Sequence, residues 1–202
     1  TAKLQTAIDQ LYLNSATKGS AQSKIVLHLE AGEYIVDDTI YIPPYATIVG
    51  AGSGKTIIRT STASTTIFKT VNSNSTPGAP ATDASTTSVN QATDIRLEGV
   101  TLETTVPNKG LILENCKDSV FRDVEVTGPW VSGNAVALTD VGIEMNSLSG
   151  TVETKNNIFE NCKVSGYSYG ISSDWDIHNN MWDNCSFASC SYGFAFATNL
   201  NT

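Results

Sequence analysis

Three charged residues occupy matching places in three similar stretches of the chain, a fourth lies beside one of them, and their types are those of acid–base chemistry on sugars. Arg122 and Asp123 belong to the first stretch, Glu160 to the second and Asp183 to the third. Glycoside hydrolysis needs two carboxyl groups roughly 5–10 Å apart across a groove. Glu160 and Asp183 would satisfy this on neighbouring strands, which lie about 4.8 Å apart. The alternative, which we favour, is a solvated charge ladder in which Arg122 offsets the acids and which adds little stability.

A second group of residues has the side chains that bind carbohydrate. Sugar recognition uses aromatic faces beside amides and carboxylates in a shallow groove. Tyr169 and Tyr192 each precede a glycine at equivalent places, so we expect them to stack as an aromatic column. Ordinary packing of aromatic rings between coils is the alternative and explains the same pattern. The carbohydrate-binding candidates are Trp130, Tyr167, Tyr169, Asp174, Trp175, Asp176 and Tyr192.

The elements that position these residues follow from a repeated pattern. Residues 116–128, 154–166 and 177–189 each read large apolar, charged, Asp or Asn, small apolar, polar, apolar, with a fainter copy at 97–102. Phe159 and Trp182 hold the same place in consecutive copies and lie 23 residues apart (182 minus 159). A repeat of this length is typical of a solenoid.

Within each copy the apolar residues alternate, as Cys162 and Val164 do, which indicates strands. Asp123, Asn161 or Asn184 precedes the alternating pair, and these residue types enter the left-handed backbone region readily. Parallel crossovers are overwhelmingly right-handed. We therefore predict an all-β fold, a right-handed single-stranded parallel β-helix of about 23 residues per coil. Its interior columns would be Phe121, Phe159 and Trp182, and Val124, Cys162 and Cys185.

The same register places Val120, Ile158 and Met181 on the outside, next to the interior aromatic column. Monomers seldom leave such an apolar column bare. We expect a subunit interface there.

The 202 residues are expected to form a single domain, 1–202, that is a fragment of a longer chain, because the sequence stops in what reads as the middle of a coil. Residues 1–14 read as an amphipathic capping helix. The first coils span 24–70, a Ser/Thr-rich surface loop spans 71–92, and Asn-cornered coils span 93–202. Glycines that open short apolar strands between the copies predict a second sheet.

Charge and motifs exclude several functions. The net charge of −8 argues against nucleic acid, which needs a basic face. No apolar run approaches the roughly 20 residues of a membrane span. The cysteines lack zinc spacing, and we expect no metal and no cofactor. The glycine-rich run Gly50–Thr56 lacks the first glycine and the following helix of a phosphate loop, so it reads as a corner.

The N-terminal coils contain a sequence pattern that is similar to that of a known superfamily. An amphipathic helix followed by LHLEAGEY (residues 27–34) and TIVGAG (residues 47–52) is similar to the pectate-lyase-like superfamily of β-helices, and within it to the first coils of bacteriophage tailspikes and tail fibres. The resemblance covers nearly the whole chain. It implies the fold directly, whereas the superfamily holds lyases, hydrolases and non-enzymatic adhesins.

Among those functions, the resemblance implies a structural and host-attachment module of the virion tail, which is extracellular and faces cell-surface polysaccharide. It also implies that the parent protein is a homotrimer. A polysaccharide lyase or glycoside hydrolase and a secreted bacterial adhesin are the alternatives. Lyases of this kind pair calcium-binding acids with a base, usually Arg, and only Arg122 with Asp123 and Glu160 could mimic that set. The motif of galacturonan hydrolases is not present, so we expect any catalysis of the parent protein to lie in coils beyond this fragment.

Overall fold

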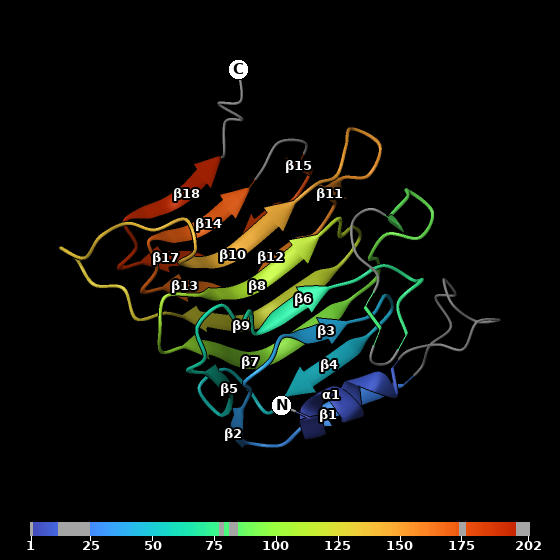
Figure 1. The fold of residues 1–202 in the computed structure, drawn as a ribbon, viewed down its shortest axis with the longest axis horizontal. Coiled ribbons are helices and arrows are strands. Elements are labelled where there is room, and N and C mark those ends of the chain that lie inside the picture. Colours follow the sequence, from blue (N-terminus) through green and yellow to red (C-terminus); the bar gives the residue numbers. More distant parts are fainter. Residues whose placement is uncertain (1, 12–24, 77–78, 81–84, 174–176, 197–202) are drawn as a thin grey trace.

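The repeated stretches form strands that stack in parallel, coil upon coil, in the computed structural model of the chain (Figure 1). It describes residues 2–11, 25–76, 79–80, 85–173 and 177–196. All pairings between the named strands are parallel in this part of the chain. This arrangement is that of a parallel β-helix, as the sequence predicted.

The strands form two large sheets and one small one. The ten-stranded sheet, sheet A, contains β1 (Val26–Leu29), β2 (Gly32–Ile35), β4 (Thr47–Gly50), β5 (Thr56–Thr60), β7 (Arg96–Thr104), β9 (Val120–Thr127), β12 (Ile158–Glu160), β13 (Lys163–Ser165), β16 (Met181–Asp183) and β17 (Ser186–Ala188). The six-stranded sheet, sheet B, contains β3 (Ile40–Ile42), β6 (Phe68–Thr70), β8 (Lys109–Glu114), β10 (Val141–Asn146), β14 (Tyr169–Ser173) and β18 (Tyr192–Phe196). A two-stranded sheet joins β11 (Thr154–Lys155) to β15 (Ile177–His178).

Residues with a left-handed backbone conformation form the corners within sheet A. Asp123, Asn161 and Asn184 have φ of 51°, 55° and 50°, and Gly99 holds the equivalent place with φ of 62°. Glycine is favoured at position 99 because a Cβ there would lie only 3.1 Å from the Gly52 nitrogen, a tight contact with backbone. The glycine-rich run that contains Gly52 therefore packs on this corner, which explains why one copy of the pattern is fainter than the others.

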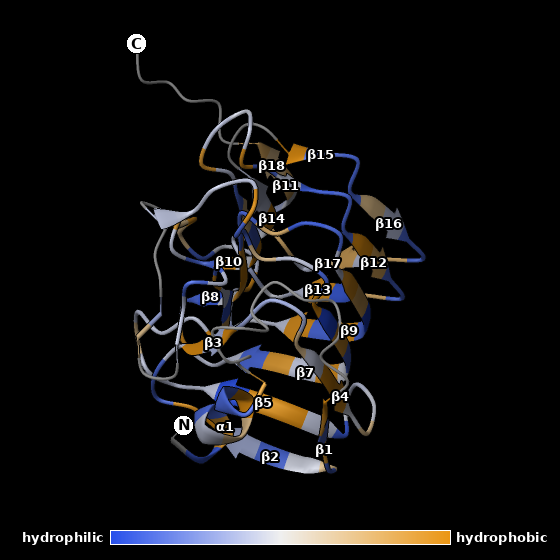
Figure 2. Cartoon of the chain, turned by 90° about the vertical axis from the view of Figure 1, so that its right-hand side faces the viewer, coloured by the Kyte–Doolittle hydropathy of each residue, from blue (hydrophilic) through white to orange (hydrophobic). Residues whose placement is uncertain are grey.

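The interior columns are those that the sequence predicted. Phe121 pairs in register with Phe159, and Phe159 with Trp182. The Phe121 and Phe159 ring centroids are 4.9 Å apart, and those of Phe159 and Trp182 are 3.8 Å apart, both stacked. Val124 and Cys162 are buried in the second column, where Cys185 is partly buried. Apolar residues, coloured orange in Figure 2, recur along the strands at successive levels of the stack.

Coil length varies along the stack. Register partners in the aromatic column are 24 residues apart between Leu97 and Phe121, 38 between Phe121 and Phe159, and 23 between Phe159 and Trp182 (121 minus 97, 159 minus 121, 182 minus 159). The long coil contains the excursion 129–139, which leaves the stack at its side (Figure 1, yellow). The repeat is therefore interrupted by loops, whereas the register of the column is kept.

A helix covers the N-terminal end of the stack. Helix α1 (Ala2–Asp9) is the one α-helix in the described residues, and it contacts β3. Leu4 and Ile8, together with Leu11 just beyond the helix, are buried against the first coils. The expected helix 1–14 is thus shorter by several residues, and positions 12–14 lie outside the described part.

Candidate functional site

The charged candidates form a ladder on the outer face of sheet A. Arg122 on β9 donates from Nε to Glu160 Oε2 on β12 at 2.8 Å and from Nη1 to Glu98 Oε1 on β7 at 3.1 Å. Arg96 donates in turn to Glu98 at 2.9 Å. The hydrogen bond from Arg96 lowers the pKa of Glu98, with Arg122 adding to the effect, and the hydrogen bond to Glu160 raises the pKa of Arg122. The geometry is that of the predicted ladder, in which Glu160 is already bound to a cation.

Asp183 is the register partner of Glu160 on the next coil and is exposed. The two carboxyl groups thus belong to adjacent strands, and Glu160 is part of the ladder whereas Asp183 is not. No ion pair to Asp183 is formed within the described residues.

Asp123 holds the glycine-rich corner. Its carboxylate accepts hydrogen bonds from Ser53 Oγ at 2.9 Å and from the Ser53 N–H at 3.3 Å. The neighbouring Gly54 N–H donates to Thr101 Oγ1 at 2.8 Å. The run Gly50–Thr56 is therefore a corner whose backbone amides donate hydrogen bonds to side chains of later coils. Asp123 stabilises this corner through its hydrogen bonds to Ser53.

The outward apolar residues are neighbours. Val120, Ile158 and Met181 are consecutive register partners on β9, β12 and β16. Val120 and Ile158 are half-buried, and the exposed surface of this column is concentrated on Met181, which is 51% exposed. The subunit interface expected here stays a prediction.

Tyr169 and Tyr192 form the aromatic column that the sequence predicted, on the outer face of sheet B. They pair in register on β14 and β18, and their rings stack with centroids 5.2 Å apart at an interplanar angle of 13°. Tyr192 is 52% exposed and Tyr169 is half-buried. This tyrosine pair presents an aromatic surface to solvent.

Tyr167 is not a surface residue, and its assignment as a carbohydrate-binding candidate is wrong. It is fully buried, donates from its hydroxyl to the Thr127 carbonyl at 2.9 Å, and accepts from Thr104 Oγ1 at 3.0 Å. Burial raises the pKa of its phenol. The ring fills the space left by glycines: a Cβ on Gly128 would lie 2.7 Å from Tyr167 Cε1, and one on Gly142 would lie 3.2 Å from Cδ2.

The remaining aromatic candidates lie elsewhere. Trp130 is half-buried in the excursion, where its backbone N–H donates to the Gly166 carbonyl at 2.7 Å. Its indole Nε1 is buried and has no hydrogen-bond partner among the described residues. Residues Asp174, Trp175 and Asp176 lie outside the described part of the chain.

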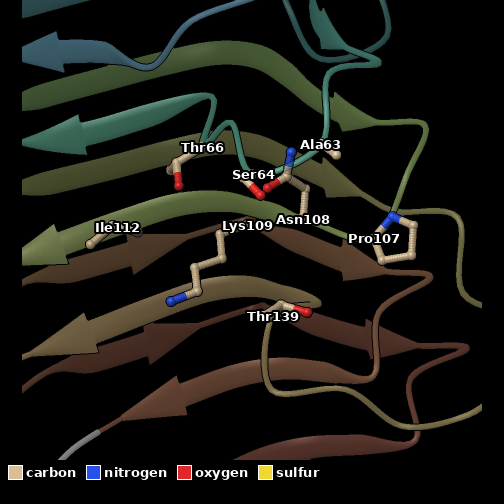
Figure 3. Close-up of a pocket in the computed structure, with 8 residues that line it drawn as sticks. All are labelled: Ala63, Ser64, Thr66, Pro107, Asn108, Lys109, Ile112 and Thr139. Carbon is tan, nitrogen blue, oxygen red and sulfur yellow. The ribbon is translucent and has the colours of Figure 1, made fainter.

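A pocket of about 320 Å³ on the side of sheet B was not predicted (Figure 3). Three segments far apart in the sequence build it, 63–66, 107–112 and the end of the excursion at Thr139. Lys109 forms an ion pair with Glu144 of the next coil. Asn108 Nδ2 donates to the Thr62 carbonyl at 2.8 Å and so fixes the wall formed by the first segment. The lining includes Ser64, Thr66, Asn108, Lys109, Ile112 and Thr139.

No group of three or more His, Cys, Asp or Glu side chains in the described residues is placed to hold a metal ion. In the same residues no helix has the length and apolar character needed to cross a bilayer. The four cysteines are free thiols. Burial raises the pKa of Cys116 and of Cys162 to about 12.

Stacked parallel coils, left-handed Asn corners and interior aromatic columns define a β-helix of the pectate-lyase-like class. The chain belongs to the family described as rhamnogalacturonase A/epimerase, pectate lyase-like, whose model matches residues 1–195. The superfamily resemblance of the sequence is thereby confirmed. None of the curated proteins compared with the chain matches it.

Solved structures of phage proteins are similar to the chain, and one of them superimposes well enough to indicate a shared fold. ORF18 of Geobacillus virus E2 superimposes with a TM-score of 0.59 at 18% identity, over 93% of this chain and 39% of that one. The N-terminal fragment of bacteriophage phi29 gene product 12 gives a TM-score of 0.44 at 14% identity, over 90% of this chain and 40% of that one. The chain therefore spans less than half the length of these structures.

Proposed function

We propose that this chain is part of a phage tailspike or tail fibre, extracellular on the virion, and that the outer face of sheet B binds cell-surface polysaccharide. The observation that carries the binding is the tyrosine pair, Tyr169 stacked on Tyr192 and exposed to solvent. A sugar ring presents an apolar C–H face that packs on such a surface, while its hydroxyls need polar neighbours. The placement in a virion is supported by the resemblance of the first coils to tailspikes. We also propose that the coils wind in the right-handed sense, with about 23 residues per coil.

Calorimetric titration tests the binding, with capsular, O-antigen and pectic polysaccharides as probes. We expect the wild-type chain to bind at least one of them, and Tyr192→Ala to weaken that binding roughly two- to twelvefold, because an aromatic contact contributes roughly 0.5–1.5 kcal/mol. Tyr41→Ala is the matched control, since Tyr41 belongs to the same sheet but to the strand at its other end. Binding of no polysaccharide, or equal losses in both variants, would contradict the proposal.

The assembly is proposed to be a homotrimer with Val120, Ile158 and Met181 at its interface. The support is the exposure of an apolar Met181 at the end of this outward column. Sedimentation analysis of the chain and of Met181→Lys tests it. A trimer that dissociates in the variant is expected, and a monomer at concentrations well above those of the binding assay contradicts it for this chain.

Polysaccharide cleavage is the second candidate function. It is favoured by the register of Glu160 with Asp183 on adjacent strands and by the enzymes that the family description names. Release of reducing ends from the same polysaccharides would indicate a hydrolase, and an unsaturated product with new ultraviolet absorbance would indicate a lyase. Loss of that release in Asp183→Asn, with binding retained, would assign the chemistry to this pair.

A further inference from the structure

The pocket and the tyrosine pair lie along one column of sheet B. Lys109 in the pocket is the register partner of Val141, Val141 of Tyr169, and Tyr169 of Tyr192. Strands are about 4.8 Å apart, so the backbone positions of Lys109 and Tyr192 are separated by roughly 14 Å along the stack. A ligand that touched both would run across the coils rather than along a strand.

Hydrogen bonds of the excursion join the pocket wall to the start of the strand that carries Tyr169, and Val141, which lies between Lys109 and Tyr169 in the column, is buried. Thr139 lines the pocket, and the next residue, Asp140, is buried. Asp140 Oδ2 accepts hydrogen bonds from the Ser168 N–H and from Ser168 Oγ, both at 2.8 Å, and Ser168 immediately precedes Tyr169. The Ala137 N–H donates to Ser168 Oγ at 3.1 Å. The wall of the pocket is therefore anchored to the start of the strand that carries the tyrosine.

The charges on this sheet cancel in pairs. The six strands of sheet B contain four charged residues, and these form two ion pairs, Lys109 with Glu144 and Lys69 with Glu114. The chain as a whole has a net charge of −8. A polyanion would thus meet no unpaired cation on these strands and would be repelled at long range.

The lining of the pocket can still bind a neutral sugar. The ammonium group of Lys109 has three donors, and the hydroxyls of Ser64 and Thr139 in the same lining can donate and accept, so together they can bind sugar hydroxyls as donors and as acceptors. The pocket volume of about 320 Å³ lies near the lower end of the range of ligand pockets. That volume suits a short saccharide unit rather than a long chain.

We propose that the pocket is a second sugar subsite, and that sheet B takes an uncharged glycan running across the coils from Lys109 to Tyr192. This inference rests on the proposed binding function and adds the class of glycan, its direction and a second contact. Lys109 and the hydroxyls of the pocket lining bind hydroxyl groups at one end, and the tyrosine pair packs on a sugar face at the other.

Titration of wild-type chain with neutral polymers (dextran, mannan, galactan) and acidic ones (polygalacturonate, hyaluronan, glycerol-phosphate teichoic acid) tests the class. We expect a neutral polymer to bind best, with an affinity that is unchanged between about 0.05 and 0.5 M salt, because no net charge is screened. Stronger binding of the acidic polymers, weakened by salt, overturns the class. Binding of none of the six overturns the proposed function together with this inference.

The second subsite is tested with Lys109→Met, and Lys69→Met is the matched control because it breaks the other ion pair of the sheet, outside the pocket lining. We expect Lys109→Met to lose about tenfold in affinity, as for a lost hydrogen bond to a charged group, and Lys69→Met to bind as the wild type does. Equal losses of affinity in both lysine variants would remove the subsite and leave the binding function standing. The same conclusion would follow if Lys109→Met lost no affinity while Tyr192→Ala still bound more weakly than the wild type.

Oligosaccharides cut from the bound polymer provide a test without substitution. Affinity for the wild-type chain should rise with length until the oligomer spans the roughly 14 Å between the two contacts, and then level off. Full affinity already in a monosaccharide or disaccharide would contradict the second contact.

Discussion

The side-chain amide of Gln5 pairs with the backbone of Tyr41 as a neighbouring strand would. Gln5 Oε1 accepts from the Tyr41 N–H at 2.9 Å, and Gln5 Nε2 donates to the Tyr41 carbonyl at 3.3 Å. Strand β3 is the N-terminal edge of sheet B, and unpaired edges favour association with other chains. The capping helix thus covers apolar surface and also satisfies the backbone of the first strand of the candidate binding sheet.

Replacing Gln5 by Ala should destabilise this end of the stack by about 1–3 kcal/mol, because two partly buried backbone groups lose their partner. Gln10→Ala is the control, since Gln10 is exposed just beyond the same helix. Chemical denaturation of both variants measures the difference. Equal stabilities would show that solvent replaces the amide without cost.

Tyr167→Phe should destabilise the fold and leave polysaccharide binding intact. The substitution leaves the Thr127 carbonyl and the Thr104 hydroxyl without their buried partner, which costs about 1–3 kcal/mol. Tyr169→Phe keeps the exposed ring and should change stability little. Denaturation midpoints together with titration of both variants check this, and a binding loss confined to Tyr167→Phe would return Tyr167 to the candidate site.

Acid should weaken the ladder through Glu98. The pKa of Glu98 is lowered from 4.5 in the folded chain, mainly by the Arg96 hydrogen bond. Its contribution to the free energy of unfolding is therefore complete above the pKa of the unfolded chain, and it is lost as the pH falls through the lower pKa of the folded chain. We expect the free energy of unfolding to fall less steeply in Glu98→Gln than in the wild type as pH drops below about 4.5. Identical pH profiles of the two proteins in denaturant titrations would show that the ladder does not contribute.

The buried thiols should be inert in the folded chain. Burial holds the pKa of Cys116 and Cys162 near 12, so neither is ionised at mild alkaline pH, where thiolates are the reactive species. Mass spectrometry after brief iodoacetamide treatment should find both unmodified in native protein and alkylated in denaturant. Rapid native alkylation of Cys162 would mean that the second interior column opens.

Regular repetition decided what could be predicted from the sequence. The column of Phe121, Phe159 and Trp182 and the corners at Asp123, Asn161 and Asn184 follow from alternation and spacing, because each coil solves the same steric problem. The stacking of Tyr169 on Tyr192 follows from the same register. A repeat fixes which residues are neighbours on successive coils, so columns are its most reliable consequence.

Features that depend on loops could not be predicted in this way. Tyr167 is two residues from Tyr169, but Gly166, with φ of 74°, turns the chain between strands and sends Tyr167 inward. The glycines that face it, Gly128 and Gly142, were the available signal, since they leave room for a ring. The pocket near Lys109 combines three segments without any shared spacing, and only the folded chain brings them together.

The central claim, that sheet B is the glycan-binding face, is tested most directly by hydroxyl-radical footprinting with and without the bound polysaccharide. Tyr192 on sheet B and Ile35 on sheet A provide an internal comparison, because they are 52% and 57% exposed in the free chain and neither belongs to the proposed subunit interface. We expect the polysaccharide to protect Tyr192, and Tyr169 beside it, while the oxidation of Ile35 stays unchanged. Protection of Ile35 with Tyr192 still oxidised would place the glycan on sheet A and contradict this account.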